Sequence, residues 1–156
     1  MIIKILMIVL LVLVIVILLK TRQYFKRKKA FRLVEELSQK QVNQVVADTL
    51  VKCGLLEKQV ELTSNVISEI WGQGVLAFSY EVQLHEELSD LAKCQREFIS
   101  QLKLVSESKN LQGLPGYPSV MVTDFWLEEK TLLHIDVANI VNKATAQYVH
   151  DIKKVE

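Results

Sequence analysis

The hydrophobic and polar positions of this 156-residue chain separate an unbroken apolar segment from a longer amphipathic part. Residues 1–19 contain a single polar side chain, Lys4. A helix of that length rises roughly 28 Å, which is close to the hydrocarbon thickness of a bilayer. A cleaved signal peptide is disfavoured, because the basic residues come after the apolar segment and no small-residue cleavage site follows it. The pattern predicts an uncleaved signal-anchor, a transmembrane helix over residues 1–19.

A basic segment, residues 20–32, follows directly and carries seven basic side chains and no acidic one. The positive-inside rule then predicts a single pass through the cell (inner) membrane, with the N-terminus outside and the C-terminal domain in the cytoplasm. Aromatic rings suit the headgroup region, and lysines attract anionic lipid. The residues expected at the membrane interface are Lys20, Arg22, Tyr24, Phe25, Lys26, Arg27, Lys28 and Lys29.

The charge of the chain is unevenly distributed along its length. Eight of the 19 basic residues lie before Leu33, which leaves 11 against all 18 acidic residues, so residues 33–156 carry a net charge of 11 − 18 = −7. A basic nucleic-acid footprint is disfavoured, because the basic segment is short and the domain attached to it is acidic. Cys53 and Cys94 are too far apart in sequence to form a disulfide framework, and we expect both thiols to be reduced.

Apolar residues over 33–156 recur with helical spacing. A first stripe runs from Leu33 to Lys52, where Gly54 is placed to end the helix. A second covers Leu55–Trp71, and a last one covers residues 127–155. Between them lies a heptad seam, which suits either an antiparallel bundle or an intermolecular coiled coil. Its positions are Leu84, Leu88, Leu91, Gln95, Phe98, Leu102 and Val105. The sequence therefore predicts an all-α fold, in which the transmembrane helix continues into a small cytoplasmic bundle of about four helices.

One irregular loop is expected in this bundle, at residues 106–124, because it contains both prolines and a Gly that permits a turn. Long structured loops are more often functional than short ones, so we expect a partner to bind near this loop. The residues predicted to contact the partner are Gln95, the polar position of the seam, together with Tyr117, Phe125 and Trp126.

The densest group of titratable residues is Glu81, His85, Glu86 and Asp90. A dinuclear carboxylate bundle needs Glu-x-x-His on two helices, whereas Glu-x-x-x-His occurs here once. Cys94 and His85 would lie about 13 Å apart along one helix, too far for a nucleophile and its base. No phosphate-binding loop, dinucleotide motif or zinc-type cysteine spacing occurs, so we expect no cofactor and no metal site.

These patterns favour a non-enzymatic tether, scaffold or subunit that binds a protein at the cytoplasmic membrane face. The partner would be a membrane or cytoplasmic protein, or a second copy of the chain, with anionic lipid at the basic segment and no nucleic acid. One alternative is a membrane-bound enzyme or enzyme subunit with Glu81, His85 and Cys94 as its candidate residues. Another is an oligomerising membrane-active protein of the lysis or toxin type, although the apolar segment lacks the small-residue motif that such association uses.

Overall fold

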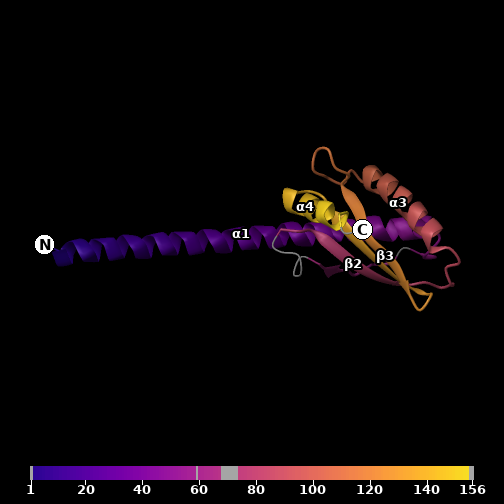
Figure 1. Cartoon of the computed structure of the whole chain (residues 1–156), viewed down its shortest axis with the longest axis horizontal. Helices are drawn as coiled ribbons and strands as arrows, with labels where there is room; N and C mark the ends of the chain where they lie inside the picture. The colour runs from indigo at the N-terminus through magenta and orange to yellow at the C-terminus, as the bar shows by residue number, and fades with distance from the viewer. Residues whose placement is uncertain (1, 59, 68–73, 155–156) are drawn as a thin grey trace. The chain divides into compact units, whose positions relative to one another are not determined.

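The computed structural model describes residues 2–58, 60–67 and 74–154, with side chains described from residue 10 onward. These residues form three helices and a four-stranded antiparallel sheet (Figure 1). The elements are α1 (Ile2–Lys52), β1 (Asn65–Val66), β2 (Ala77–Gln83), α3 (Leu91–Ser108), β3 (Val120–Glu128), β4 (Leu132–Asn139) and α4 (Lys143–Ile152). The prediction of an all-α helical bundle is therefore wrong, because the helices pack on a four-stranded sheet.

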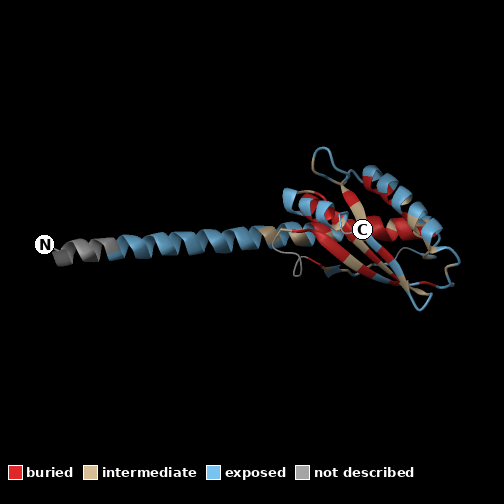
Figure 2. Cartoon of the chain, viewed as in Figure 1, coloured by how far each residue is buried: buried red, intermediate tan, exposed pale blue. Residues whose placement is uncertain are grey.

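The chain divides into two compact units, residues 1–36 and residues 37–156. The first unit consists of the N-terminal part of α1, where all side chains from Leu10 to Leu19 are apolar and exposed (Figure 2). Among the residues that the structure describes, no helix offers an apolar stretch of the length that crossing a bilayer requires.

This finding contradicts the prediction of a transmembrane helix over residues 1–19. The side chains of residues 1–9 lie outside the described part of the chain. A single-pass location in the inner membrane, with a cytoplasmic C-terminal domain, is consequently not supported. The basic segment 20–32 is helical, and Lys20 to Ala30 are exposed along α1. Tyr24 and Phe25 meet edge to face, with ring centroids 5.8 Å apart. Contact of this segment with anionic lipid remains a prediction.

The sheet of the second unit has the strand order β1-β2-β4-β3, so β4 is central and β3 is an edge strand. Two of the predicted helical regions contain strands, and a third begins with a loop. Part of Leu55–Trp71 is irregular or forms β1, and its end lies outside the described residues. The first two positions of the heptad seam, Leu84 and Leu88, lie in the loop between β2 and α3. The region 127–155 begins with the β3–β4 hairpin. The predicted loop is shorter than 106–124, since α3 extends to Ser108 and β3 begins at Val120.

One face of this sheet packs against α1 and α3. The buried side of α1 presents Val42, Val45, Val46 and Leu50, which are part of the stripe that the sequence predicts. Alternate strand residues supply the other half of this core, because successive side chains of a strand point to opposite faces. They are Phe78, Tyr80 and Val82 of β2 and Leu133, Ile135 and Val137 of β4. Helix α3 adds Phe98, whose ring centroid lies 5.6 Å from that of Phe125 on β3.

The end of α1 follows the sequence prediction. Gly54 has a φ of +69°, the left-handed conformation that glycine adopts at helix C-termini. The Gly54 N–H donates to the Val51 carbonyl at 3.0 Å, and the Leu55 N–H donates to the Leu50 carbonyl at 2.9 Å. These two bonds form a Schellman motif and satisfy carbonyls that the helix end would leave without partners.

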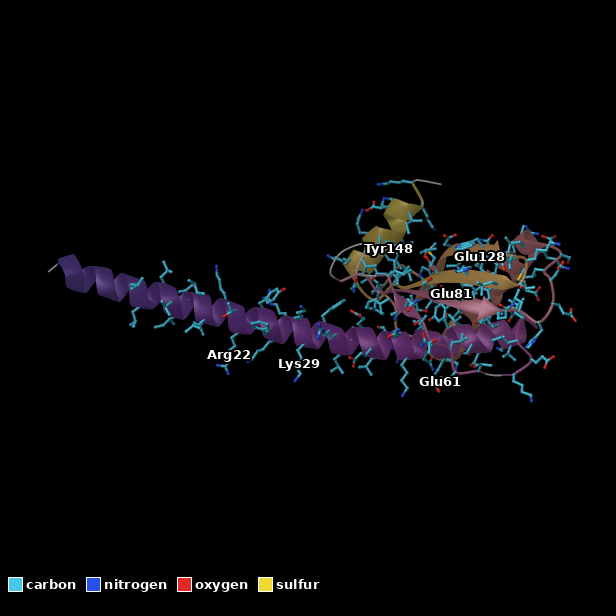
Figure 3. The ribbon with its side chains drawn as sticks, turned by 90° about the horizontal axis from the view of Figure 1, so that it is seen from below. Arg22, Lys29, Glu61, Glu81, Glu128 and Tyr148 are labelled. Carbon is cyan, nitrogen blue, oxygen red and sulfur yellow. The ribbon has the colours of Figure 1, made fainter. Side chains whose placement is uncertain are left out.

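The opposite face of the sheet is covered only in part, by α4. Figure 3 shows α4 on the other side of the strands from α1. Ala146, Tyr148 and Val149 of α4 form a second cluster with Ala77 and Ala138 of the sheet. Further along these strands the alternate positions become polar. The uncovered, polar part of this face is where we place the candidate functional site.

Candidate functional site

Two rows of side chains cross the uncovered part of the sheet. In each row, neighbouring residues on β2, β4 and β3 are paired in register, as Ser79–Asp136–Asp124 and Glu81–His134–Trp126. Glu128 lies two residues beyond Trp126 on β3, and Figure 3 shows Glu81 and Glu128 on the strands with Tyr148 on α4. We call these seven residues, Ser79, Glu81, Asp124, Trp126, Glu128, His134 and Asp136, the acidic patch. Four of them are carboxylates.

An aromatic pair lies within the acidic patch. The rings of Trp126 and His134 are stacked, with centroids 3.8 Å apart and an angle of 3° between their planes. His134 Nε2 lies 3.1 Å from Glu128 Oε2, so the carboxylate holds the imidazole against the indole. The His134 side chain is only 13% exposed, whereas Trp126 is 43% exposed. The pair therefore presents a fixed indole surface, bordered by carboxylates, to whatever binds this face.

Asp136 is the half-buried member of the acidic patch. Burial raises the pKa of its carboxyl above the usual value, and the facing Asp124 carboxylate raises this pKa further. A hydrogen bond with Ser79 and the proximity of His134 oppose the rise. The pKa of the Tyr148 phenol is also raised, chiefly by burial and in part by Asp136 and Asp124. The negative charges gathered in the patch therefore lower the free energy of unfolding. Unfavourable arrangements of this kind are typical of sites that bind or catalyse.

Asp136→Asn is expected to stabilise the protein at pH 7. Because the pKa of Asp136 is higher in the folded than in the unfolded state, the folded state binds more protons between the two pKa values. The contribution of Asp136 to stability therefore falls as the pH rises through this window, and asparagine removes that loss. Urea unfolding should show a higher midpoint for the variant at pH 7 and no difference at about pH 3, below the unfolded pKa. Glu81→Gln, at an exposed position of the same patch, is the control, and a lower midpoint for Asp136→Asn at pH 7 would contradict the argument.

The three residues proposed for an enzyme are not brought together. Glu81 points to the uncovered face of the sheet, whereas Cys94 is buried on α3 at the opposite face. Burial raises the pKa of Cys94, and Glu97 contributes to the rise. Burial, with smaller contributions from Glu97 and Cys94, raises the pKa of Cys53 to about 11. Both thiols are free and protonated at neutral pH, the state in which cysteine is a poor nucleophile.

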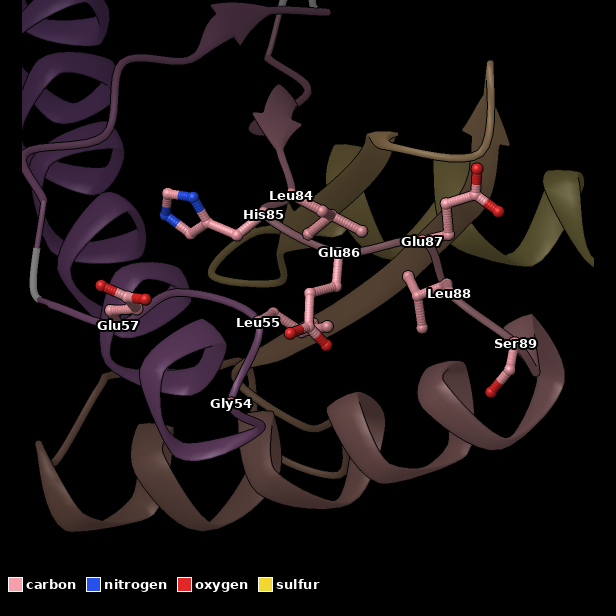
Figure 4. A pocket seen from close by; sticks show the side chains of 9 residues that line it. All are labelled: Gly54, Leu55, Glu57, Leu84, His85, Glu86, Glu87, Leu88 and Ser89. Carbon is pink, nitrogen blue, oxygen red and sulfur yellow. The ribbon is translucent and has the colours of Figure 1, made fainter.

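His85 and Glu86 line a polar pocket of about 330 Å³ between the end of α1 and the loop that precedes α3 (Figure 4). Glu57 and Glu87 also line it, and Glu87 pairs with Lys130 at 3.3 Å. Asp90 belongs to neither the pocket nor the patch, since its carboxylate caps α3 by accepting the Lys93 N–H at 2.9 Å. Within the described part of the chain, no group of three or more His, Cys, Asp or Glu residues is arranged to hold a metal ion.

The four residues predicted to contact a partner lie in three places. Trp126 is exposed in the acidic patch, whereas Phe125, its neighbour in β3, is buried against Phe98. Gln95 of α3 lies with Phe125 along a groove beside β3. Tyr117 is exposed on the loop before β3, next to α4. Phe125 and Trp126 therefore lie on β3 with Gln95 on the neighbouring helix α3, whereas Tyr117 lies apart from them.

Five members of the acidic patch were not predicted from the sequence, namely Ser79, Asp124, Glu128, His134 and Asp136. A signal for three of them was present in the alternation of polar and apolar residues along Ala77–Gln83 and Leu132–Asn139, which is the pattern of half-buried strands. His134 and Asp136 occupy the polar positions of β4, and Ser79 occupies one of β2. Their convergence depends on strand pairing, which no local pattern reports.

No known protein family, curated protein or solved structure matches the chain.

Proposed function

We propose that the protein is a non-enzymatic scaffold or subunit that binds a basic protein partner on the acidic patch. The Trp126–His134 stack carries this proposal, because it holds a large aromatic surface exposed on a rigid sheet. Tryptophan is among the residues most enriched at the energetic centres of protein interfaces. Glu128 holds the imidazole of His134, and this imidazole in turn supports one face of the exposed indole.

The charge around the indole specifies the class of partner. Carboxylates flank Trp126 along β3 at Asp124 and Glu128 and across the sheet at Glu81. A partner rich in lysine or arginine would complement this charge, and such complementarity raises the association rate and excludes acidic competitors. Arginine has the additional property of stacking on an indole face. The net charge of −7 over residues 33–156 favours the same choice.

Site-specific crosslinking tests this function in the cells that make the protein. A photoreactive residue at Gln83, which is exposed on β2 beside the acidic patch, should yield one discrete adduct with a polypeptide that is basic at the crosslinked site. Trp126→Ala should reduce the adduct at least about tenfold, as expected for the loss of an interface hot spot. Tyr117→Ala, which removes a similarly exposed aromatic ring from another surface, should leave the adduct unchanged. An adduct that survives Trp126→Ala, or one with an acidic polypeptide, would contradict the proposal.

A further inference from the structure

The outer edge of β3 is a second recognition element, adjacent to the acidic patch. β3 is the last strand of the sheet, and β4 is its neighbour on the inner side. No main-chain hydrogen bond connects Val120–Glu128 to any described residue outside β4. Exposed edges of this kind are templates for the addition of another strand, so natural proteins either protect them or use them.

The hydrogen bonds of β4 identify which main-chain groups of β3 point outward. The Asn139 N–H donates to Leu76, and the Thr131 carbonyl accepts from Leu84, so the odd-numbered residues at the ends of β4 bond toward β2. Because bonding directions alternate along an antiparallel strand, the even-numbered residues of β4 bond toward β3. Their partners on β3 are Met121, Asp124, Trp126 and Glu128. The other residues of β3 that are paired in register, Val120, Val122, Phe125 and Leu127, therefore direct their N–H and C=O groups to the free edge.

A groove of about 390 Å³ runs along this edge. Gln95 and Ile99 of α3 form one wall, and Val149, Ile152 and Lys153 of α4 form the other. Ile99 is 45% exposed although it is a large aliphatic residue. A strand added to β3 would place one set of alternate side chains against Ile99 and the other set on the side of α4 and the acidic patch.

The edge also carries a device that prevents indiscriminate pairing. Thr123 is an extra residue between Val122 and Asp124 in the pairing with β4, which makes a β-bulge. Directly after it, the Asp124 carboxylate accepts the outward N–H of Phe125 at 2.8 Å and so occupies one edge donor. A lysine or arginine on an incoming strand would draw this carboxylate away and free the donor. A second copy of β3 would instead bring Asp124 and Glu128 against like charges, which destabilises cross-strand pairing.

We infer that β3 binds its partner by strand addition, and that the partner segment is an extended peptide with alternating apolar and basic residues. Its apolar side chains contact Ile99 in the groove, and its basic side chains meet Asp124 and the carboxylates beyond it. Lys153 lies at the α4 end of the groove, so the basic positions belong to the half of the segment nearer Trp126. This inference rests on the proposed function and specifies how that partner binds.

A synthetic peptide, (Lys-Val)4, tests the inference with the full chain. Fluorescence anisotropy should detect binding of the labelled peptide, and a (Glu-Val)4 peptide should bind at least tenfold more weakly. At saturation, hydrogen exchange followed by NMR should slow at least tenfold at the outward amides of Val122 and Leu127. A (Lys-Val)4 peptide that is N-methylated on every amide cannot pair with an edge, and it should lose both the binding and the protection.

A matched pair of variants tests the groove. Ile99→Lys places a positive charge in the groove and should weaken binding of (Lys-Val)4 at least tenfold. Leu104→Lys makes the same change at a position of α3 that is 53% exposed and outside the groove, and it should change the affinity less than twofold.

Each remaining outcome overturns the inference in a recognisable way. Binding that depends on Trp126 but leaves the edge amides unprotected would reject strand addition and keep the proposed function. Protection of Val122 that grows with protein concentration, without peptide, would identify a second copy as the occupant. Absence of (Lys-Val)4 binding would reject the peptide chemistry, whereas only the crosslinking result at Gln83 decides on the proposed function.

Discussion

Phe98→Ala is expected to lower the free energy of unfolding by about 3–5 kcal/mol, the usual loss when a fully buried phenylalanine is truncated. Phe98 is 0% exposed and contacts Phe125, so alanine removes both the buried area and an aromatic pair. Phe98 is also the residue through which α3 rests on the edge strand. The variant should therefore lose the groove beside β3 along with its stability.

Urea unfolding followed by circular dichroism measures this change. Ile99→Ala is the control, because Ile99 is the next residue of the same helix and is largely exposed. We expect the control to change the free energy of unfolding by less than about 1 kcal/mol. A loss below 1 kcal/mol for Phe98→Ala would mean that α3 does not pack on the sheet in solution.

The helices were predictable from sequence where each buries one apolar face against the sheet. The C-terminal part of α1 buries one stripe against the sheet, and Gly54 ends it, so local spacing and a local stop signal were sufficient. The same holds for α3, where Phe98, Leu102 and Val105 of the predicted seam are buried. Leu84 and Leu88 fit the heptad spacing by coincidence, because they lie in the loop between β2 and α3 and not in the helix.

The β3–β4 hairpin was missed because its turn has none of the residues that usually mark one. Glu129, Lys130 and Thr131 connect the strands, and the first two have φ values of +51° and +65°. Tight hairpin turns with two positive φ angles normally contain Asn-Gly or a similar pair, since most side chains are strained there. With glutamate and lysine at these positions, the segment resembles the first turns of a helix in sequence.

The candidate site was predictable only in fragments. Trp126 was selected for its chemistry and its proximity to the loop, and the structure places it in the acidic patch, stacked on His134. Its partners His134 and Asp136 depend on register with β4, and Glu81 depends on pairing through β2. Such pairings arise from long-range packing, which spacing along one segment does not encode. The apolar N-terminal segment had the opposite effect. Its composition led to the prediction of a membrane protein, whereas the sheet and its helices are formed by residues after position 36.

Asn43→Ala is expected to lower the free energy of unfolding by about 2–4 kcal/mol, because it disconnects a polar network where α1 crosses β2. The Tyr80 and Ser64 hydroxyls each donate to Asn43 Oδ1 at 2.8 Å, and Asn43 Nδ2 donates to the Leu62 carbonyl at 3.0 Å. Tyr80 is only 1% exposed, so alanine at position 43 removes an acceptor from a hydroxyl whose other side-chain partner is Ser64. Unfolding of the purified chain in urea gives the loss directly.

A double-mutant cycle with Tyr80→Phe separates the network from simple packing. Tyr80→Phe alone removes one donor and should cost about 1 kcal/mol. In the Tyr80→Phe background, Asn43→Ala should lower the free energy of unfolding by at least about 1 kcal/mol less than in the parent, because no phenolic hydroxyl is left without its acceptor. Gln39→Ala, which removes a peripheral bond to the Ser64 carbonyl at 2.8 Å, should cost less than Asn43→Ala. Additive losses in the cycle would show that Tyr80 and Asn43 act independently. Coupled losses would mean that the amide of Asn43 fixes the position of β2 along α1. Because Glu81 follows Tyr80 on β2, the same amide would then also fix the position of Glu81 in the acidic patch.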